Sequence, residues 1–194
     1  MNNNKSNEIS TIKKFDKMYN SPLHWIWSDF RIPQELKDLT AACNPRNSLE
    51  LGCGLGYYSS FMAKKGIDAI GVDFSQAGIG KARQRVAYHD FRPTFKIGNV
   101  TNLDKLKEPF DVSFDVGCFH CLEQEEQQKY VSEIARLLKP GAVHLLWTMD
   151  STPNNLKFSP EYISKVFDNE FQLANSTFSR RRIVASHWYW LLRK

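Results

Sequence analysis

A loop with glycine at every second position is the first feature of this sequence that could hold a ligand. The loop Gly52–Gly56 follows a short apolar segment, 48–51, and precedes a stretch whose apolar residues have helical spacing. Glycines at a strand-to-helix turn permit a tight bend and let the backbone approach a ligand closely. The spacing differs from the G-x-G-x-x-G loop that receives the pyrophosphate of dinucleotides. Glu50, two residues before the loop, suits a ligand without phosphate whose amino acid part carries an ammonium group.

A second acid strengthens the prediction of a binding site. Asp73 ends the apolar segment 69–73, which predicts a second strand. A carboxylate at this point can accept both hydroxyls of a ribose. It could instead cap the next helix, but Ser75 already suits the capping position. Phe74, beside the acid, can cover one face of a purine.

Predicted strands and helices alternate along most of the chain. The expected strands are 48–51, 69–73, 94–97, 111–115 and 142–147, and the expected helices are 33–42, 57–65, 75–88, 123–139 and 160–167. This alternation predicts an α/β fold with a doubly wound, mostly parallel, Rossmann-like sheet. Segments 171–178 and 183–192 are joined by a short polar connection, which predicts an antiparallel hairpin at one edge.

These motifs together resemble those of the class I S-adenosylmethionine-dependent methyltransferases. The resemblance extends over residues 40–194 and rests on four features. They are E-x-G-x-G-x-G after the first strand, an acid ending the second strand, a polar residue after the third strand and L-L-K-P-G before the fifth strand. The resemblance implies a seven-stranded sheet and S-adenosyl-L-methionine as cofactor. Its cofactor-binding positions here are Glu50, Gly52, Cys53, Gly54, Gly56, Tyr57, Asp73, Phe74, Asn99, Val100, Asp115 and Cys118.

The resemblance also assigns parts of the cofactor to these residues. Glu50 and the glycine loop would hold the methionine part, and Asp73 would bind the ribose hydroxyls. Asn99 and Val100 would flank the adenine. The family usually has Asp at the position of Asn99; the Asn oxygen can still accept a hydrogen bond from the adenine amino group, but without a charge.

The loop after the fourth strand, 115–121, is expected next to the reacting methyl group, because ligands of such sheets sit beyond the carboxyl ends of the strands. Its F-D-x-G-C-F-H sequence resembles small bacterial methyltransferases of the thiopurine-methyltransferase-like or tellurite-resistance-like group. That resemblance implies a small-molecule acceptor, aromatic or with a thiol or other soft nucleophile. His120 is the candidate base for an acceptor that must lose a proton, whereas a thiolate needs none. Alternatively, His120 packs under the long helix.

The N-terminal part of the chain is rich in aromatic residues. Residues 1–10 are polar and predict a disordered tail. Residues 11–194 predict a single domain, in which residues 11–42 form a helical lid on a cofactor-binding core of residues 43–194. Aromatic faces can lie near a sulfonium cation. Ordinary packing against the sheet is the alternative for each residue. The candidate lid and acceptor-site residues are Tyr19, His24, Trp25, Trp27, Phe119 and Trp147.

The net charge of +5 comes from the end of the chain. After Glu170 there are five cationic residues and no acidic one, while residues 1–170 are balanced. The patch Arg180–Arg182 could touch phosphates, but it is small and lies at a predicted turn, so a nucleic acid is a less favoured partner. The alternatives to a small-molecule enzyme are an RNA or protein methyltransferase using Arg180–Arg182, and a non-catalytic S-adenosylmethionine-binding protein.

Cysteines and segment types set further expectations. Cys118-x-x-Cys121 has no second pair with zinc-ligand spacing, so we expect no metal. The polar N-terminus lacks the apolar stretch of a signal peptide, and no apolar run reaches the roughly 20 residues needed to cross a bilayer. We therefore expect a cytoplasmic protein without membrane contact, a monomer or weak dimer.

Overall fold

The computed structural model describes residues 2–22, 30–107, 109–150, 156–180 and 184–194. Strands and helices alternate until the final two strands. The elements are α1 (Asn2–Asn20), α2 (Gln34–Cys43), β1 (Asn47–Leu51), α3 (Tyr57–Lys64), β2 (Asp68–Asp73), α4 (Gln76–Val86), β3 (Thr94–Ile97), β4 (Phe110–Val116), the 3-10 turn η2 (Phe119–Cys121), α5 (Gln124–Leu137), β5 (Leu138–Met149), α6 (Pro160–Phe167), β6 (Phe171–Ser179) and β7 (Ser186–Arg193).

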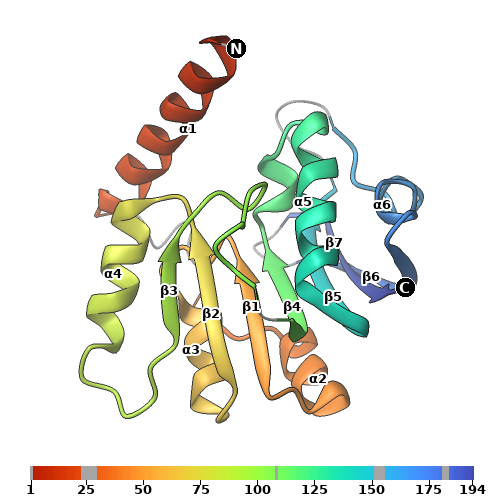
Figure 1. Ribbon diagram of the computed structural model, residues 1–194, viewed down its shortest axis with the longest axis horizontal. Helices are drawn as coiled ribbons and strands as arrows, with labels where there is room; N and C mark the ends of the chain where they lie inside the picture. Colours follow the sequence, from red (N-terminus) through yellow and green to blue (C-terminus); the bar gives the residue numbers. More distant parts are fainter. Residues whose placement is uncertain (1, 23–29, 108, 151–155, 181–183) are drawn as a thin grey trace.

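Seven strands form one sheet in the order β3-β2-β1-β4-β5-β7-β6 (Figure 1). The first five strands are parallel, and β7 is antiparallel to both β5 and β6. The predicted doubly wound sheet with a terminal antiparallel hairpin is confirmed. The strand order reverses direction between β1 and β4, and the carboxyl ends at such a switch point are where open α/β sheets bind ligands.

The core has two layers, one on each face of the sheet. On one face α5 and α6 bury a mainly aromatic cluster that includes Phe119, Tyr130 and Phe167. On the other face α2 and α3 pack on Trp147 and Trp188. Both layers reach the strand ends, so side chains in the loops there are held by core packing.

The fifth strand begins earlier than the sequence predicts. The expected helix 123–139 ends at Leu137, and β5 starts at Leu138, which pairs with Phe110. The register then shifts before Val112 pairs with Val143. Pro140 cannot donate to a ladder and Gly141 has a φ of 77°, so this dipeptide interrupts strand pairing rather than stopping a helix. The last strand, in contrast, begins later than the sequence predicts, at Ser186 and not at residue 183.

The predicted disorder of residues 1–10 is wrong, because the helix α1 extends from Asn2 to Asn20. Its C-terminal half is held against α4, where the carboxylate of Asp16 accepts a hydrogen bond from the amide of Ala77. Once one end of a helix is anchored, each added residue gains a hydrogen bond. The helix therefore forms here although the segment is polar. Figure 1 shows the N-terminal half of α1 leading away from the sheet. Within the described ranges, no helix has the length and apolar character needed to cross a membrane.

Candidate functional site

The glycine loop bends sharply at the carboxyl end of β1. Gly52, Gly54 and Gly56 have φ values of 67°, 49° and 68°, a left-handed conformation that costs residues with a Cβ about 1–2 kcal/mol. The amide of Gly56 donates to the carbonyl of Cys53 at 2.7 Å and closes the turn. The bend itself therefore explains the alternating glycines.

Asp73 fixes this loop from the end of β2. Its Oδ2 accepts a hydrogen bond from the amide of Gly54 at 2.8 Å, and its Oδ1 accepts one from the amide of Ser75 at 2.8 Å. Burial raises the pKa of Asp73 to about 6. Ser75 caps α4 as predicted, accepting from the amide of Gly78. Each Asp73 oxygen can take one more donor, so the predicted bonds to ribose hydroxyls are compatible with these contacts.

Glu50 is buried one strand away. Its Oε2 accepts hydrogen bonds from the amide and the hydroxyl of Ser59, the former at 2.7 Å. Burial raises the pKa of Glu50 to about 8, and the bonds from Ser59 offset this only in part. A cation beside the carboxyl group would favour its ionised form. This arrangement fits the predicted partner, an ammonium group.

Arg85, which the sequence analysis missed, supports the loop from α4. Its guanidinium donates to the carbonyl of Leu55 at 2.9 Å and to the hydroxyl of Ser60 at 2.9 Å. The same group lies 4.3 Å from the ring centre of Tyr57. Arg85 is 30 residues from Leu55 in sequence, so no local pattern could have marked it.

Asp115 organises the loop after β4. Its Oδ1 accepts from the amides of Gly117 and Cys118 at 2.9 and 2.7 Å, and its Oδ2 accepts from the amide of Phe119 at 2.9 Å and the hydroxyl of Tyr130 at 2.7 Å. Burial raises the pKa of Asp115 to about 6. Because four donors surround its two oxygens, Asp115 fixes the conformation of the loop. Direct contact between Asp115 and a cofactor stays a prediction.

The side chains that follow Asp115 are buried. His120 is 8% exposed, with its ring centre 5.8 Å from that of Trp147 and 6.4 Å from that of Phe158. Phe119 and Trp147 are at most 1% exposed and belong to the two core layers. Packing, the alternative stated above, therefore describes Phe119 and Trp147 better than direct contact with an acceptor. His120 lies at the edge of this packing, next to Gly117.

Tyr19 reaches the glycine loop from α1. A Cβ placed on Gly54 would lie 2.5 Å from the Tyr19 Oη. Asp16, one turn earlier, accepts from the Ser75 hydroxyl and from the Ala77 amide at 3.2 Å. The helix α1 thus covers the loop through a specific docking contact, as a lid would.

The residues expected around the adenine have partners within the protein. Phe74 packs edge-on against Phe15 of α1, with ring centres 5.2 Å apart. Asn99 accepts from the amide and hydroxyl of Thr101 at 3.0 and 2.8 Å through its Oδ1. Val100 is 3% exposed. The Asn99 oxygen that would meet the adenine amino group therefore already has two donors.

His24, Trp25 and Trp27 of the lid lie outside the described residues, as do Arg181 and Arg182 of the basic patch.

Two cations at the end of the chain are paired. Arg193 forms an ion pair with Glu170 at 3.1 Å, and Lys194 forms one with Asp168 at 3.5 Å. These contacts tie the last strand to the segment after α6, so part of the terminal charge excess has a structural role.

A His–Asp pair that the sequence analysis missed lies at the carboxyl end of β5. His187 Nδ1 is 2.7 Å from Asp150 Oδ1, and both side chains are half-buried. The amide of Phe158 donates to the carbonyl of Asp150 at 3.0 Å, and Phe158 is the same residue that packs on His120. The partners are 37 residues apart, so only the fold brings them together.

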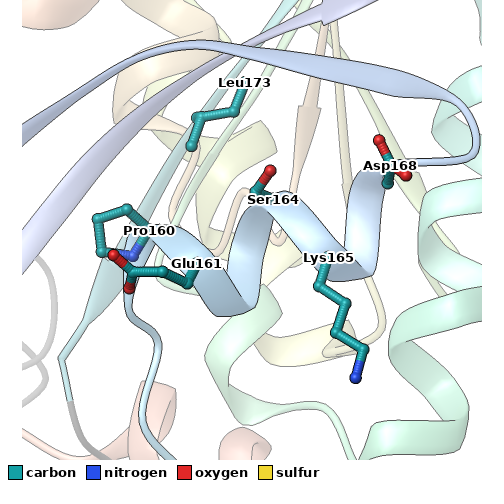
Figure 2. A pocket seen from close by; sticks show the side chains of 6 residues that line it. All are labelled: Pro160, Glu161, Ser164, Lys165, Asp168 and Leu173. Carbon is teal, nitrogen blue, oxygen red and sulfur yellow. The ribbon is translucent and has the colours of Figure 1, made fainter.

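The cavity in Figure 2, about 620 Å³, lies elsewhere. It is formed by α6 and by Leu173 of β6, and its lining includes no residue of the glycine loop or of the loop after β4. Figure 2 shows Ser164 and Lys165 on α6 and Asp168 directly after its end. This hollow therefore does not mark the predicted cofactor site. Its lining residues are Pro160, Glu161, Ser164, Lys165, Asp168 and Leu173.

Three buried carboxyl groups meet at the switch point. Asp73 and Asp115 both raise the pKa of Glu50, although burial is the larger cause. Among the ion pairs of the described residues, none reaches these three groups. A cationic ligand would offset their repulsion and their burial.

Residues 49–141 match the profile of a family described as a methyltransferase domain. This part of the chain is similar to a methyltransferase domain. The matched range contains the glycine loop, Asp73 and Asp115, so it covers the geometry described above. The match agrees with the class of protein that the motifs predict.

Two named proteins are similar to this chain in sequence. A protein of Mycolicibacterium smegmatis, named a probable S-adenosylmethionine-dependent methyltransferase, is 37% identical over 124 residues, which cover 63% of this chain and 44% of that protein. The chain thus spans less than half the length of this relative. A ubiquinone biosynthesis O-methyltransferase of Hahella chejuensis is 28% identical over 175 residues, 82% of this chain and 70% of that protein.

Solved structures show the same fold. A Burkholderia thailandensis 1,6-didemethyltoxoflavin-N1-methyltransferase, with its acceptor and S-adenosylhomocysteine bound, has a TM-score of 0.80 at 18% identity, covering 97% of this chain and 90% of that one. A TehB-like S-adenosylmethionine-dependent methyltransferase of Corynebacterium glutamicum has a TM-score of 0.70 at 18% identity, covering 84% and 89%. These likenesses support the fold and do not select a subgroup.

Proposed function

We propose that the protein transfers the methyl group of S-adenosylmethionine to a small-molecule acceptor. The observation that carries this proposal is the cluster of three buried carboxyl groups, Glu50, Asp73 and Asp115, beside a left-handed glycine loop in a methyltransferase domain. S-adenosylmethionine, when bound, supplies a methyl group activated by a positively charged sulfur. Its sulfonium and ammonium charges would offset the burial of these acids and their mutual repulsion.

Each residue of the site has a role in this proposal. The free Oε1 side of Glu50 faces the ammonium group, and the backbone of Gly52–Gly56 permits a close approach. Asp73 accepts from the ribose while it holds Gly54 in place. Tyr19 covers the loop from α1. Alignment of the acceptor with the methyl group and exclusion of water supply most of the rate.

The acceptor is a small aromatic or soft, thiol-bearing molecule in this proposal. The named substrates of the Hahella and Burkholderia proteins are consistent with a small molecule, and the resemblance of the 115–121 loop to the thiopurine- and tellurite-related group favours a soft atom. His120 would take the proton of a hydroxyl or amine acceptor, whereas a thiolate would need no base. In this proposal His120, whose ring lies against the buried rings of Trp147 and Phe158, borders the acceptor region.

Ligand binding and turnover test the proposal separately. S-adenosylmethionine and S-adenosylhomocysteine should raise the unfolding temperature, since a ligand of the native state stabilises it by RT ln(1+[L]/Kd). A panel of thiols, phenols and amines should then include an acceptor that releases S-adenosylhomocysteine. Stabilisation by NADH but by neither S-adenosyl compound would reject the proposal. Binding without turnover on small molecules, RNA or peptides would identify a non-catalytic binding protein.

A further inference from the structure

Two cysteines share one turn at the switch point, and the proposed transfer reaction does not use their thiols. Cys118 precedes η2 and Cys121 ends it, and the amide of Cys121 donates to the carbonyl of Cys118 at 2.9 Å. Residues at the ends of such a turn have Cα atoms less than about 7 Å apart, and side chains three residues apart eclipse each other in a 3-10 turn. Disulfides span Cα separations of about 4.4–6.8 Å, so the turn brings the pair into disulfide range.

The position of the Cys121 sulfur supports this pairing. Its Sγ lies 3.7 Å from the carbonyl oxygen of Gly117, the residue directly before Cys118. Burial raises the pKa of the Cys118 thiol above its usual range, and Cys121 is one of the neighbouring groups that raise it further. The Cys121 sulfur is therefore folded back toward the start of the turn, where Cys118 lies.

The turn touches the glycine loop directly. A Cβ placed on Gly52 would collide with the Cβ of Cys118 and lie 2.9 Å from its Sγ. Asp115 holds the amides of Gly117 and Cys118 at 2.9 and 2.7 Å. A movement of the Cys118 side chain would therefore act on the loop proposed to hold the cofactor.

The two thiols differ in exposure. Cys121 is exposed and Cys118 is half-buried, so a reagent in solution meets Cys121 first. The other two cysteines provide comparisons, because Cys43 is half-buried in α2 and Cys53 is buried in the glycine loop.

We propose that Cys118 and Cys121 form a thiol–disulfide site for low-molecular-weight disulfides such as glutathione disulfide, and that the oxidised turn binds S-adenosylmethionine more weakly. The second half rests on the proposed function. The first half rests only on the turn and on the exposure of its two thiols.

The exchange takes place in two balanced steps. The thiolate of Cys121 attacks one sulfur of glutathione disulfide, whose S–S bond breaks and releases one glutathione thiolate. The thiolate of Cys118 then attacks the Cys121 sulfur of the mixed disulfide, forming the internal bond and releasing the second glutathione. The protein thiols lose two electrons and two protons, and glutathione disulfide gains them as two thiols. Although the Cys121 residue as a whole is exposed, desolvation by the surrounding protein and the charge of Asp115 raise the pKa of its thiol to about 11, so the first step should accelerate as pH rises.

The internal bond would change the site because its sulfurs must come within about 2.05 Å of each other. The Sγ of Cys121 would leave Gly117, and the side chain of Cys118 would turn from its place against Gly52. The loss of one hydrogen bond to the cofactor weakens binding by about tenfold.

The test uses the full-length reduced protein, glutathione disulfide as oxidant and S-adenosylhomocysteine as probe. Peptide mass spectrometry after alkylation locates the linkage, and calorimetry gives the Kd before oxidation, after it and after dithiothreitol. Cys121→Ser removes the exposed thiol of the pair. Cys43→Ser is the matched control, since it removes a half-buried thiol from α2.

We expect a 118–121 linkage and a Kd raised by about tenfold in the wild type and in Cys43→Ser, reversed by dithiothreitol, and no change in Cys121→Ser. Glutathione that stays on Cys121, or a linkage of Cys118 to Cys53, would overturn the site. A 118–121 linkage with an unchanged Kd would overturn its effect on binding. If the reduced protein binds no S-adenosylhomocysteine, the proposed function fails, and the mapped linkage still decides the thiol site.

Discussion

The amide of Gly54 donates a hydrogen bond to Oδ2 of Asp73 across 2.8 Å. One carboxylate therefore holds the glycine loop and is also the group proposed to meet the ribose. Asp73→Ala should weaken S-adenosylhomocysteine binding by about 10–100-fold, as expected for the loss of hydrogen bonds to a charged group. Calorimetry measures this change. Asp68→Ala, an exposed acid at the start of the same strand, is the control and should bind normally. An unchanged Kd in Asp73→Ala would remove Asp73 from the site.

Gly54 faces Tyr19, and substitution should separate backbone strain from this contact. Gly54→Ala combines a φ of 49° with a Cβ placed 2.5 Å from the Tyr19 hydroxyl oxygen. Gly66→Ala introduces only the backbone strain, because its φ is 82° and a Cβ there would meet open space. Both should lose about 1–2 kcal/mol of unfolding free energy from the left-handed backbone, and Gly54→Ala should lose more. Urea denaturation measures the difference.

The same pair allows a double-mutant cycle. Tyr19→Ala removes the obstructing ring, so it should recover part of the additional loss in Gly54→Ala and none of the loss in Gly66→Ala. Equal losses in the two alanine variants would show that α1 does not press on the glycine loop in solution.

The raised pKa of Glu50 makes stability depend on pH. The folded protein keeps a proton on Glu50 up to about pH 8, whereas the unfolded chain releases it near its ordinary value of 4.5. Folding therefore binds a proton in this window, and stability falls as pH rises through it. Asp73 and Asp115 act in the same direction only up to about pH 6. His144, with a pKa lowered by burial to about 3, acts in the opposite direction below its ordinary value of 6.5.

Glu50 should thus dominate this dependence between pH 6.5 and 8. The unfolding free energy should fall by up to about 1.4 kcal/mol per pH unit, and Glu50→Gln should flatten the slope. Saturating S-adenosylmethionine should also flatten it in the wild type, because a cation beside the carboxyl group lowers its pKa. Urea denaturation at several pH values gives the slope. A wild-type slope equal to that of Glu50→Gln would contradict the assignment.

Local patterns in the sequence were sufficient to predict the sheet and the position of the glycine loop. Apolar periodicity and the glycine spacing placed the strands, and the position of Asp73 at a strand end was correct to the residue. The capping role of Ser75 followed from its residue type alone. These features depend on neighbours within a few positions, which a sequence displays directly.

Contacts between distant segments could not be predicted in this way. Arg85 and Leu55 are 30 residues apart, and His187 and Asp150 are 37 apart. The burial of Phe119 depends on its packing against Phe158 and other rings from separate elements. Composition also failed at the N-terminus, where the docking of Asp16 on α4 stabilises a helix in a polar segment.

His120 should matter only for acceptors that lose a proton. His120→Ala removes the candidate base at the edge of the aromatic cluster, so methylation of hydroxyl acceptors should fall by about 10²–10⁴-fold, while a thiolate acceptor should keep its rate. His187→Ala is the control, since His187 is half-buried at the same edge of the sheet and bonded to Asp150. Release of S-adenosylhomocysteine measures both rates. Equal losses on thiols and hydroxyls would assign His120 a packing role beside Trp147, and a selective loss in His187→Ala would move the base to the His187–Asp150 pair.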